Sequence, residues 1–137
     1  MKNIKISVIA LFSILLIFSC TKENDSLSKK EILIGNAWLL VDYKENGVSE
    51  WDNFDDCLKD DLWEFLSNGN GEILPGTNLC QPNDSNEPFT WEFFNNDTKI
   101  SIDGELHTID ELTSSSLIFS YYDNSNNEVY QWLFKKK

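Results

Sequence analysis

Hydrophobic and polar residues alternate in short runs along most of the chain after residue 36. In Phe89-Thr90-Trp91-Glu92-Phe93, for example, the aromatic side chains share one face and the polar side chains share the other. A period of two predicts β-strands with one buried face, and the runs end at Asn, Asp or Gly, which favour turns. The predicted strands are Ala37–Lys44, Asp61–Leu66, Gly71–Leu74, Phe89–Asn95, Lys99–Ile102, Glu105–Asp110, Ser116–Asp123 and Glu128–Lys135.

Turn-forming residues separate most of these runs, so the predicted strands follow one another as an antiparallel meander. Asn68-Gly69-Asn70-Gly71, Asp103-Gly104 and Asn124-Ser125-Asn126-Asn127 accept the backbone conformations of tight turns. Because closure of a meander removes its free edges, the sequence predicts an all-β fold, an eight-stranded antiparallel up-and-down barrel. An open β-sandwich is the alternative fold.

Residues 1–19 have the pattern of a secretory signal peptide. Lys2 and Lys5 are followed by a run from Ile6 to Phe18 that is almost wholly apolar. That run is shorter than the about 20 residues that a membrane-spanning helix needs. Cleavage is therefore favoured over an uncleaved anchor helix.

The segment Ile17-Phe18-Ser19-Cys20 resembles a lipobox, in which a small residue precedes the cysteine that receives lipid. This resemblance implies cleavage before Cys20 and lipidation of that cysteine, which would anchor the chain to a membrane. The polar residues 20–31 are then expected to form a flexible tether. Residues 32–137 are expected to form the barrel domain.

Two features lie near the boundary between tether and domain. A short helix is expected between Ser28 as N-cap and Gly35 as terminator, with Glu31 in the capping position three residues on. The Lys22-Glu23 pair followed by Asp25 resembles a signal that exports lipoproteins to the cell surface. We therefore expect an outer-membrane lipoprotein of a Gram-negative bacterium, either periplasmic or surface-exposed.

The charge of the chain excludes one class of partner. The 137 residues include 11 Lys+Arg and 23 Asp+Glu, and the formal net charge is −12. Such a chain repels phosphate backbones, so no nucleic-acid partner is expected. All the basic residues are Lys, so the planar guanidinium that binds carboxylates and phosphates in a bidentate manner is missing.

Cys57 and Cys80 lie in the two longest links between predicted strands. With Cys20 assigned to lipid they form an even pair, which predicts a disulfide in an oxidising compartment. A metal site would need further Cys or His ligands, and His107 is the only histidine. A disulfide that closes a loop of this length is worth about 3 kcal/mol.

The order of several motifs between residues 32 and 134 resembles a family of lipocalin-like domains found in bacterial lipoproteins. The segments that carry the resemblance are Leu33–Trp38, Asp56–Phe65, Asn68–Gly71, Cys80, Trp91, Ile109–Thr113 and Ser116-Leu117. Leu33–Trp38 is similar to the lipocalin Gly-x-Trp opening with one extra residue. The resemblance implies an eight-stranded barrel with a cysteine pair near one end, and it implies no particular ligand and no catalytic residues.

Candidate metal and catalytic groups have simpler structural explanations. Acidic residues between Trp51 and Leu62 offer oxygen ligands for calcium, but they lack the spacing of an EF-hand, so a solvated acidic loop is favoured. These residues are Asp52, Asp55, Asp56, Asp60 and Asp61. The sequence contains no Gly-x-Ser-x-Gly motif, and a single histidine on a strand, His107, is expected to be structural. We expect no metal, no cofactor and no enzymatic activity.

Aromatic residues make up 13% of the chain and include five Trp. If one end of the barrel is open, these rings suit a flat apolar ligand or a sugar, whereas the short chain favours a completely filled barrel. Trp51 differs in lying in the first long link, at the predicted barrel mouth. The candidate ligand-contacting residues are Trp38, Trp51, Trp63, Trp91, Phe93, Phe119 and Trp132.

The leading functional hypothesis is a non-enzymatic, membrane-anchored lipocalin-like lipoprotein that binds a small apolar molecule or a glycan. The alternative is a structural or protein-interaction module, such as an inhibitor or a complex subunit, with a filled barrel.

Overall fold

The computed structural model describes residues 27–137. The predicted signal peptide, the predicted lipidation site Cys20 and most of the predicted tether lie outside the described residues. Among residues 27–137, no helix is long and apolar enough to cross a membrane.

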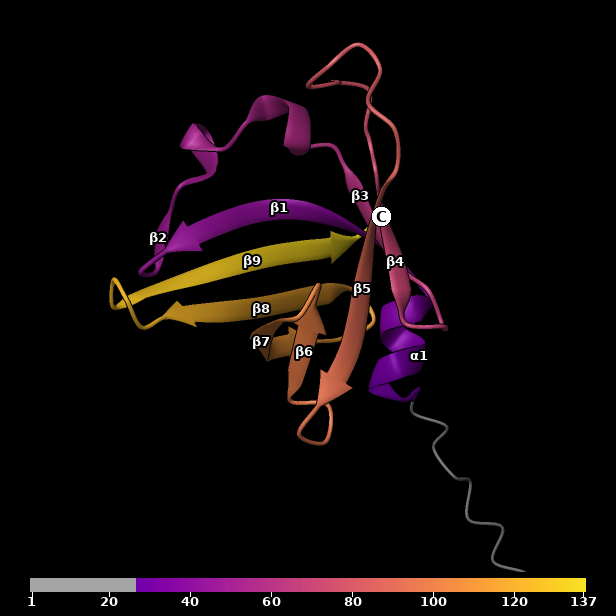
Figure 1. The fold of residues 1–137 in the computed structure, drawn as a ribbon, viewed down its shortest axis with the longest axis vertical. Coiled ribbons are helices and arrows are strands. Elements are labelled where there is room, and N and C mark those ends of the chain that lie inside the picture. Colours follow the sequence, from indigo (N-terminus) through magenta and orange to yellow (C-terminus); the bar gives the residue numbers. More distant parts are fainter. Residues whose placement is uncertain (1–26) are drawn as a thin grey trace, which may run out of the picture.

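The described chain forms a closed antiparallel β-barrel of eight strands, with one further short strand at its margin (Figure 1). Consecutive strands from β3 to β9 pair with one another, β1 pairs with β3, and pairing of β1 with β9 closes the barrel. The strands are β1 (Ala37–Glu45), β2 (Val48–Ser49), β3 (Leu62–Phe65), β4 (Asn70–Leu74), β5 (Glu87–Phe94), β6 (Lys99–Ile102), β7 (Glu105–Leu112), β8 (Ser116–Asp123) and β9 (Glu128–Lys136). The prediction of an all-β, eight-stranded antiparallel barrel is confirmed.

Strand β2 is the one strand that the alternating pattern did not predict. It has two residues, both exposed, so it carries no hydrophobic periodicity. It forms because Asn46 and Gly47 adopt positive φ angles of 52° and 81° and turn the chain back onto β1. Positive φ at both central residues is the conformation of a tight hairpin turn.

The predicted short helix is present as α1 (Lys29–Ile34). Ser28 is its N-cap, the side chains of Ser28 and Glu31 form a capping box, and Gly35 is its C-cap. The boundary that we predicted between tether and domain therefore falls inside α1, because residues 29–31 belong to the helix. Leu33 is fully buried and anchors the helix to the barrel.

One end of the barrel is filled by apolar side chains. They come from α1 and from alternate positions of the strands, as expected when one face of each strand is buried. Over the whole barrel, and not only at this end, the fully or almost fully buried hydrophobic residues are Leu33, Trp38, Leu40, Phe65, Phe89, Trp91, Ile100, Leu117, Phe119 and Phe134.

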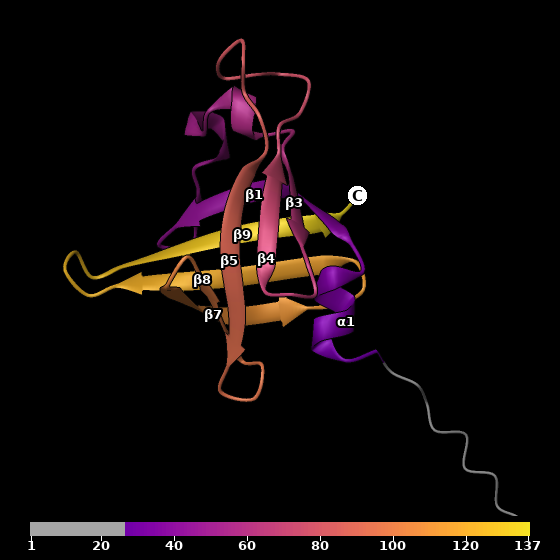
Figure 2. The same ribbon diagram turned by 45° about the vertical axis from the view of Figure 1, so that its right-hand side comes forward.

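Unequal strand lengths shape the other end of the barrel. Strand β1 pairs with β9 from Trp38 to Glu45, but it pairs with β3 only from Ala37 to Leu39. The distal halves of β1, β8 and β9 therefore extend beyond the short strands as a curved flap, whose tip points away from α1 in both views (Figures 1 and 2).

Candidate functional site

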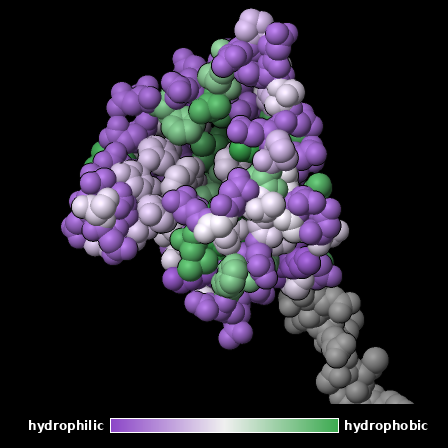
Figure 3. All heavy atoms as spheres, in the orientation of Figure 1, coloured by the Kyte–Doolittle hydropathy of each residue, from purple (hydrophilic) through white to green (hydrophobic). Residues whose placement is uncertain are grey.

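A hollow lies between the flap and the short strands. Figure 3 shows hydrophobic side chains in the recessed middle of this face, surrounded by hydrophilic ones. The hollow contains two cavities of about 370 and 190 Å³, and Trp63 on β3 and Trp132 on β9 line both. The larger cavity is also lined by Ile102, Asp103, Glu105, His107 and Phe119, and the smaller by Leu40, Phe54, Leu58, Asp61, Ile73 and Glu87.

The aromatic wall of the hollow follows from alternation on the neighbouring strands. Phe119 on β8 and Trp132 and Phe134 on β9 face inwards, because residues two apart on a strand share a face. The ring centroids of Phe119 and Trp132 are 5.5 Å apart, and those of Trp63 and Phe134 are 5.4 Å apart with the rings nearly edge to face. Such contacts hold each ring in place, so the wall exists before any ligand arrives.

His107 is the most buried polar side chain of the hollow, at 3% exposed. It lies among the rings of Phe119, Tyr121 and Trp132, at centroid distances of 5.1, 5.9 and 5.4 Å. Burial lowers the pKa of His107 to about 4, so the imidazole is neutral at pH 7. Its Nε2 is 3.5 Å from Glu105 Oε2, and its buried Nδ1 has no hydrogen-bond partner within residues 27–137.

Acidic residues gather beside aromatic ones on the inner side of the flap. The ring of Tyr43 is 5.5 Å from that of Phe54 and stacks with that of Tyr130 at 6.3 Å. The Tyr130 hydroxyl donates to the Glu128 carboxylate, and this bond, assisted by burial, raises the pKa of Tyr130 to about 12. Burial first, and then the charges of Glu128 and Glu50, raise the pKa of Glu45.

The structure brings three of the predicted ligand-contacting residues, Trp63, Phe119 and Trp132, into the hollow. Trp38 lies in the filled end instead. It has no exposed surface, and its indole N–H donates to the Leu33 carbonyl at 2.9 Å. Trp38 faces inwards, as alternation predicts. Helix α1 covers it, however, so Trp38 has no exposed surface that a ligand could contact.

Trp91 and Phe93 on β5 lie on the side of the barrel next to α1, away from the hollow. They line an open groove of about 610 Å³ together with Lys30, whose ammonium is 5.9 Å from the centre of the Trp91 ring. The Trp91 indole N–H donates to the carbonyls of Leu66 and Asn70, so this side chain joins β5 to the turn between β3 and β4.

Trp51 belongs to the 3₁₀ helix η1 (Trp51–Asn53) in the link between β2 and β3. Its ring stacks on Phe54 with the centroids 5.6 Å apart, and the Lys59 ammonium lies 5.3 Å from its centre. Phe54 in turn lines the smaller cavity. Trp51 thus supports the rim of the hollow from outside.

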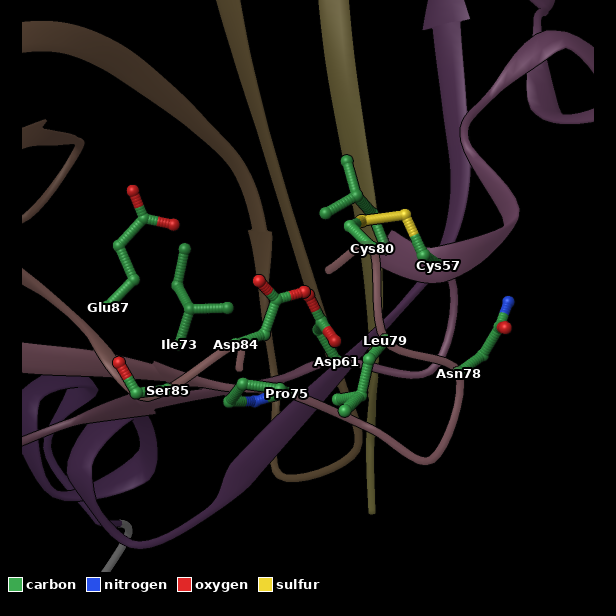
Figure 4. Close-up of a pocket in the computed structure, with 11 residues that line it drawn as sticks. Cys57, Asp61, Ile73, Pro75, Asn78, Leu79, Cys80, Asp84, Ser85 and Glu87 are labelled. Atoms are coloured by element: carbon green, nitrogen blue, oxygen red, sulfur yellow. A yellow bond between two sulfur atoms is a disulfide. The ribbon is translucent and has the colours of Figure 1, made fainter. Parts of the chain in front are cut away.

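The predicted disulfide between Cys57 and Cys80 is confirmed, and it borders a cavity of about 160 Å³ (Figure 4). It joins the 3₁₀ helix η2 (Asp56–Leu58) to the long link between β4 and β5. Asp61 accepts a hydrogen bond from the Gly76 amide at 2.8 Å in the same region. In Figure 4, Asp61 lies between the disulfide on one side and Ser85 and Glu87 on the other.

Asp60 also binds the backbone of the link between β4 and β5. Its Oδ2 accepts from the Thr77 amide at 2.7 Å, from the Thr77 hydroxyl at 2.9 Å and from the Asn78 amide at 3.2 Å. These bonds lower the pKa of the Asp60 carboxyl.

Within residues 27–137, no group of three or more His, Cys, Asp or Glu side chains is arranged to hold a metal ion.

Several residues of the hollow were not among the predicted site residues. Tyr43, Glu105 and His107 carry no motif, although Tyr130 could have been chosen because it alternates with Trp132 along β9.

The short chain favours a completely filled barrel, and the structure differs from this expectation at one end. The rings fill the end near α1, whereas the mismatch between long and short strands leaves the other end hollow.

No protein-family model matches the chain, and the comparison with curated proteins found no match. The resemblance to lipocalin-like lipoprotein domains therefore stays a prediction, while the barrel itself is observed.

Proposed function

We propose that this chain is a non-enzymatic, membrane-anchored binding protein whose barrel hollow receives a small molecule with an apolar face. The observation that carries the proposal is the partly open barrel, with cavities of about 370 and 190 Å³ that share the walls Trp63 and Trp132. Together they are within the range of small-molecule sites, about 300–1,000 Å³. Such sites are lined mainly by apolar and aromatic side chains with a few polar groups.

The rigidity of the wall supports the same proposal. A preformed aromatic surface loses little conformational entropy when a ligand stacks on it. Trp63 and Phe119 each contact at least one other ring, and the neutral His107 packs against Phe119 and Trp132. The flat face of a sugar ring or of an aromatic compound fits between such rings.

Membrane anchoring through Cys20 is the second part of the proposal. It rests on the lipobox-like segment and on the position of α1 in the barrel. Helix α1, which follows the predicted tether, lies on the opposite side of the barrel from the flap tip (Figures 1 and 2). A domain held from the α1 side would keep its hollow free.

Tryptophan fluorescence during titration with apolar compounds and oligosaccharides tests the binding site. We expect a saturable change for at least one compound, and we expect Trp132→Ala to weaken its binding by about tenfold or more, because a hydrophobic stacking partner is lost. Trp132→Phe should weaken binding less than Trp132→Ala does, because it keeps an aromatic ring. Tyr122→Ala is the control, because Tyr122 is an aromatic residue on β8 that is 50% exposed and lines neither cavity.

Two results would contradict the proposal. One is the absence of saturable binding across the whole panel. The other is binding that Trp132→Ala leaves unchanged, while urea unfolding shows that this variant is folded.

A further inference from the structure

If the hollow binds a small molecule, as proposed above, the charges around it narrow the class of that ligand. We propose that the hollow selects an organic cation, an ammonium group carried on an apolar body, over neutral or anionic compounds of the same shape.

The first argument is the charge of the lining. Four carboxylates border the two cavities, and none of the described residues that line them is a Lys. The neutral His107 adds no positive charge. The four acidic residues are Asp61, Glu87, Asp103 and Glu105.

These carboxylates are not neutralised within the described chain. Asp61 accepts from the Gly76 amide, and Asp103 accepts from the amide and the hydroxyl of Thr90. Neutral donors orient a carboxylate without cancelling its charge. The ion pairs that involve Lys in residues 27–137 are Lys44–Asp42 and Lys59–Asp56, and neither uses an acidic residue of the hollow.

The inner side of the flap extends this negative region. Glu45, Glu50 and Glu128 lie near Tyr43 and Tyr130, and their mutual repulsion contributes to the raised pKa of Glu45. Neither of the two Lys ion pairs in residues 27–137 involves one of these three glutamates. A cationic ligand is therefore attracted to the mouth of the hollow, and a carboxylate such as a fatty acid is repelled.

Aromatic faces next to carboxylates are well suited to an ammonium group. A cation is attracted to the face of Trp more strongly than to that of other rings, and the attraction grows when water is excluded. Trp63 and Trp132 line both cavities, and Glu105 lies beside His107 in the larger one. The side chain of His107 is 4% exposed, and within residues 27–137 its buried Nδ1 has no hydrogen-bond partner, so the wall of this cavity contains a polar atom that its own neighbours leave unsatisfied.

The protein already binds one of its own ammonium groups in this manner. The Lys59 Nζ lies 5.3 Å from the centre of the Trp51 ring and 2.7 Å from Asp56 Oδ1. This arrangement, an ammonium between an indole face and a carboxylate, is what the hollow offers to a ligand.

Three compounds with the same phenylbutyl body test the inference: 4-phenylbutylamine, 4-phenylbutanol and 4-phenylbutyrate. Each is titrated by calorimetry into the full-length chain in zwitterionic nanodiscs, with empty nanodiscs as the blank. We expect the amine to bind about fivefold more tightly than the alcohol and the acid to bind more weakly still. About 0.5 M NaCl should remove most of the difference, because salt screens charges near the surface.

A matched pair of variants locates the effect. Glu105→Gln should weaken binding of the amine by about fivefold and leave the alcohol unchanged, because only the charge is removed. Glu111→Gln removes the same charge from the same strand, but Glu111 is exposed and lines neither cavity, so it should change neither affinity.

The outcomes separate this inference from the proposed function. If the alcohol or the acid binds as tightly as the amine, or if only an oligosaccharide binds, the preference for cations is wrong while the binding site stands. The preference for cations is also wrong if Glu105→Gln weakens binding of the amine and of the alcohol equally. If nothing in either panel binds, the proposed function itself fails.

Discussion

At the scale of single residues, His107 shows how burial changes the role of a side chain. On the sequence it is one polar residue on a strand. In the fold it is packed against the rings of Phe119 and Trp132 and is held neutral. Its imidazole contributes to the wall of the hollow as a flat, uncharged ring, and protonation would place a charge in an apolar setting.

The lowered pKa of His107 predicts a loss of stability in acid. In the fold the pKa is about 4, and the ordinary value is 6.5, so between these values the unfolded chain binds more protons. Above pH 6.5 the imidazole is neutral in both states, so it does not lower the free energy of unfolding. As the pH falls from 6.5 towards 4, the unfolded chain is stabilised by protonation of His107 and the free energy of unfolding decreases. By pH 5 the loss should be about 2 kcal/mol.

The variant His107→Phe isolates this contribution, because it keeps a ring in the same place and removes the titrating group. Urea unfolding of the wild type and the variant at pH 7.5 and 5 gives the comparison. The wild type should lose more stability than the variant on acidification. Equal losses in the two proteins would show that His107 is not the group responsible.

At the scale of elements, the links above the short strands are held together by covalent and polar bonds. The Cys57–Cys80 disulfide, the Asp60 carboxylate and the Asp61 carboxylate all join the link before β3 to the link between β4 and β5. Short strands offer few ladder hydrogen bonds, so these cross-links supply order that the strands alone do not. They also position the rim of the smaller cavity, which includes Leu58 and Glu87.

Removal of the disulfide should therefore affect both stability and binding. We expect Cys57→Ala/Cys80→Ala to lower the free energy of unfolding by about 3 kcal/mol, because the unfolded chain regains the freedom of the closed loop. Urea unfolding measures this loss. Any ligand found for the hollow should bind more weakly to the folded double variant. A variant with wild-type stability and affinity would show that the polar bonds alone hold the two links.

At the scale of the whole molecule, α1 and the open end of the barrel lie on opposite sides of the domain (Figure 1). Helix α1 closes the filled end near the start of the described chain, and the flap with its acidic and aromatic inner face extends away from it (Figure 1). This arrangement is what a domain needs if it is fixed to a surface through its N-terminus and binds a molecule from solution.

Lipid attachment at Cys20 predicts that Cys20→Ala releases a folded domain from the membrane. Cell fractionation and metabolic labelling with a fatty acid, compared between wild type and variant, measure attachment. Circular dichroism of the released protein should retain the β-sheet signal, because residues 27–137 contain the whole barrel. Absence of label on the wild type, or a variant that stays in the membrane fraction, would contradict the anchor.

The sequence by itself determined which faces of the strands are buried, how α1 is capped and which cysteines pair. These features depend on local periodicity, on side chains three residues apart or on a simple count of cysteines. The sequence also favoured a closed barrel, because a meander of eight strands has few other ways to cover its edges.

Only the tertiary structure decided where along the barrel each inward-facing ring lies. Alternation predicts that Trp38 and Trp132 both face inwards, yet α1 covers Trp38 and Trp132 lines the hollow. The difference comes from the mismatch between the long strands β1 and β9 and the short strand β3, which is a property of pairing and not of any one segment. The acidic and aromatic hollow exists because that mismatch leaves one end of the barrel without side chains to fill it.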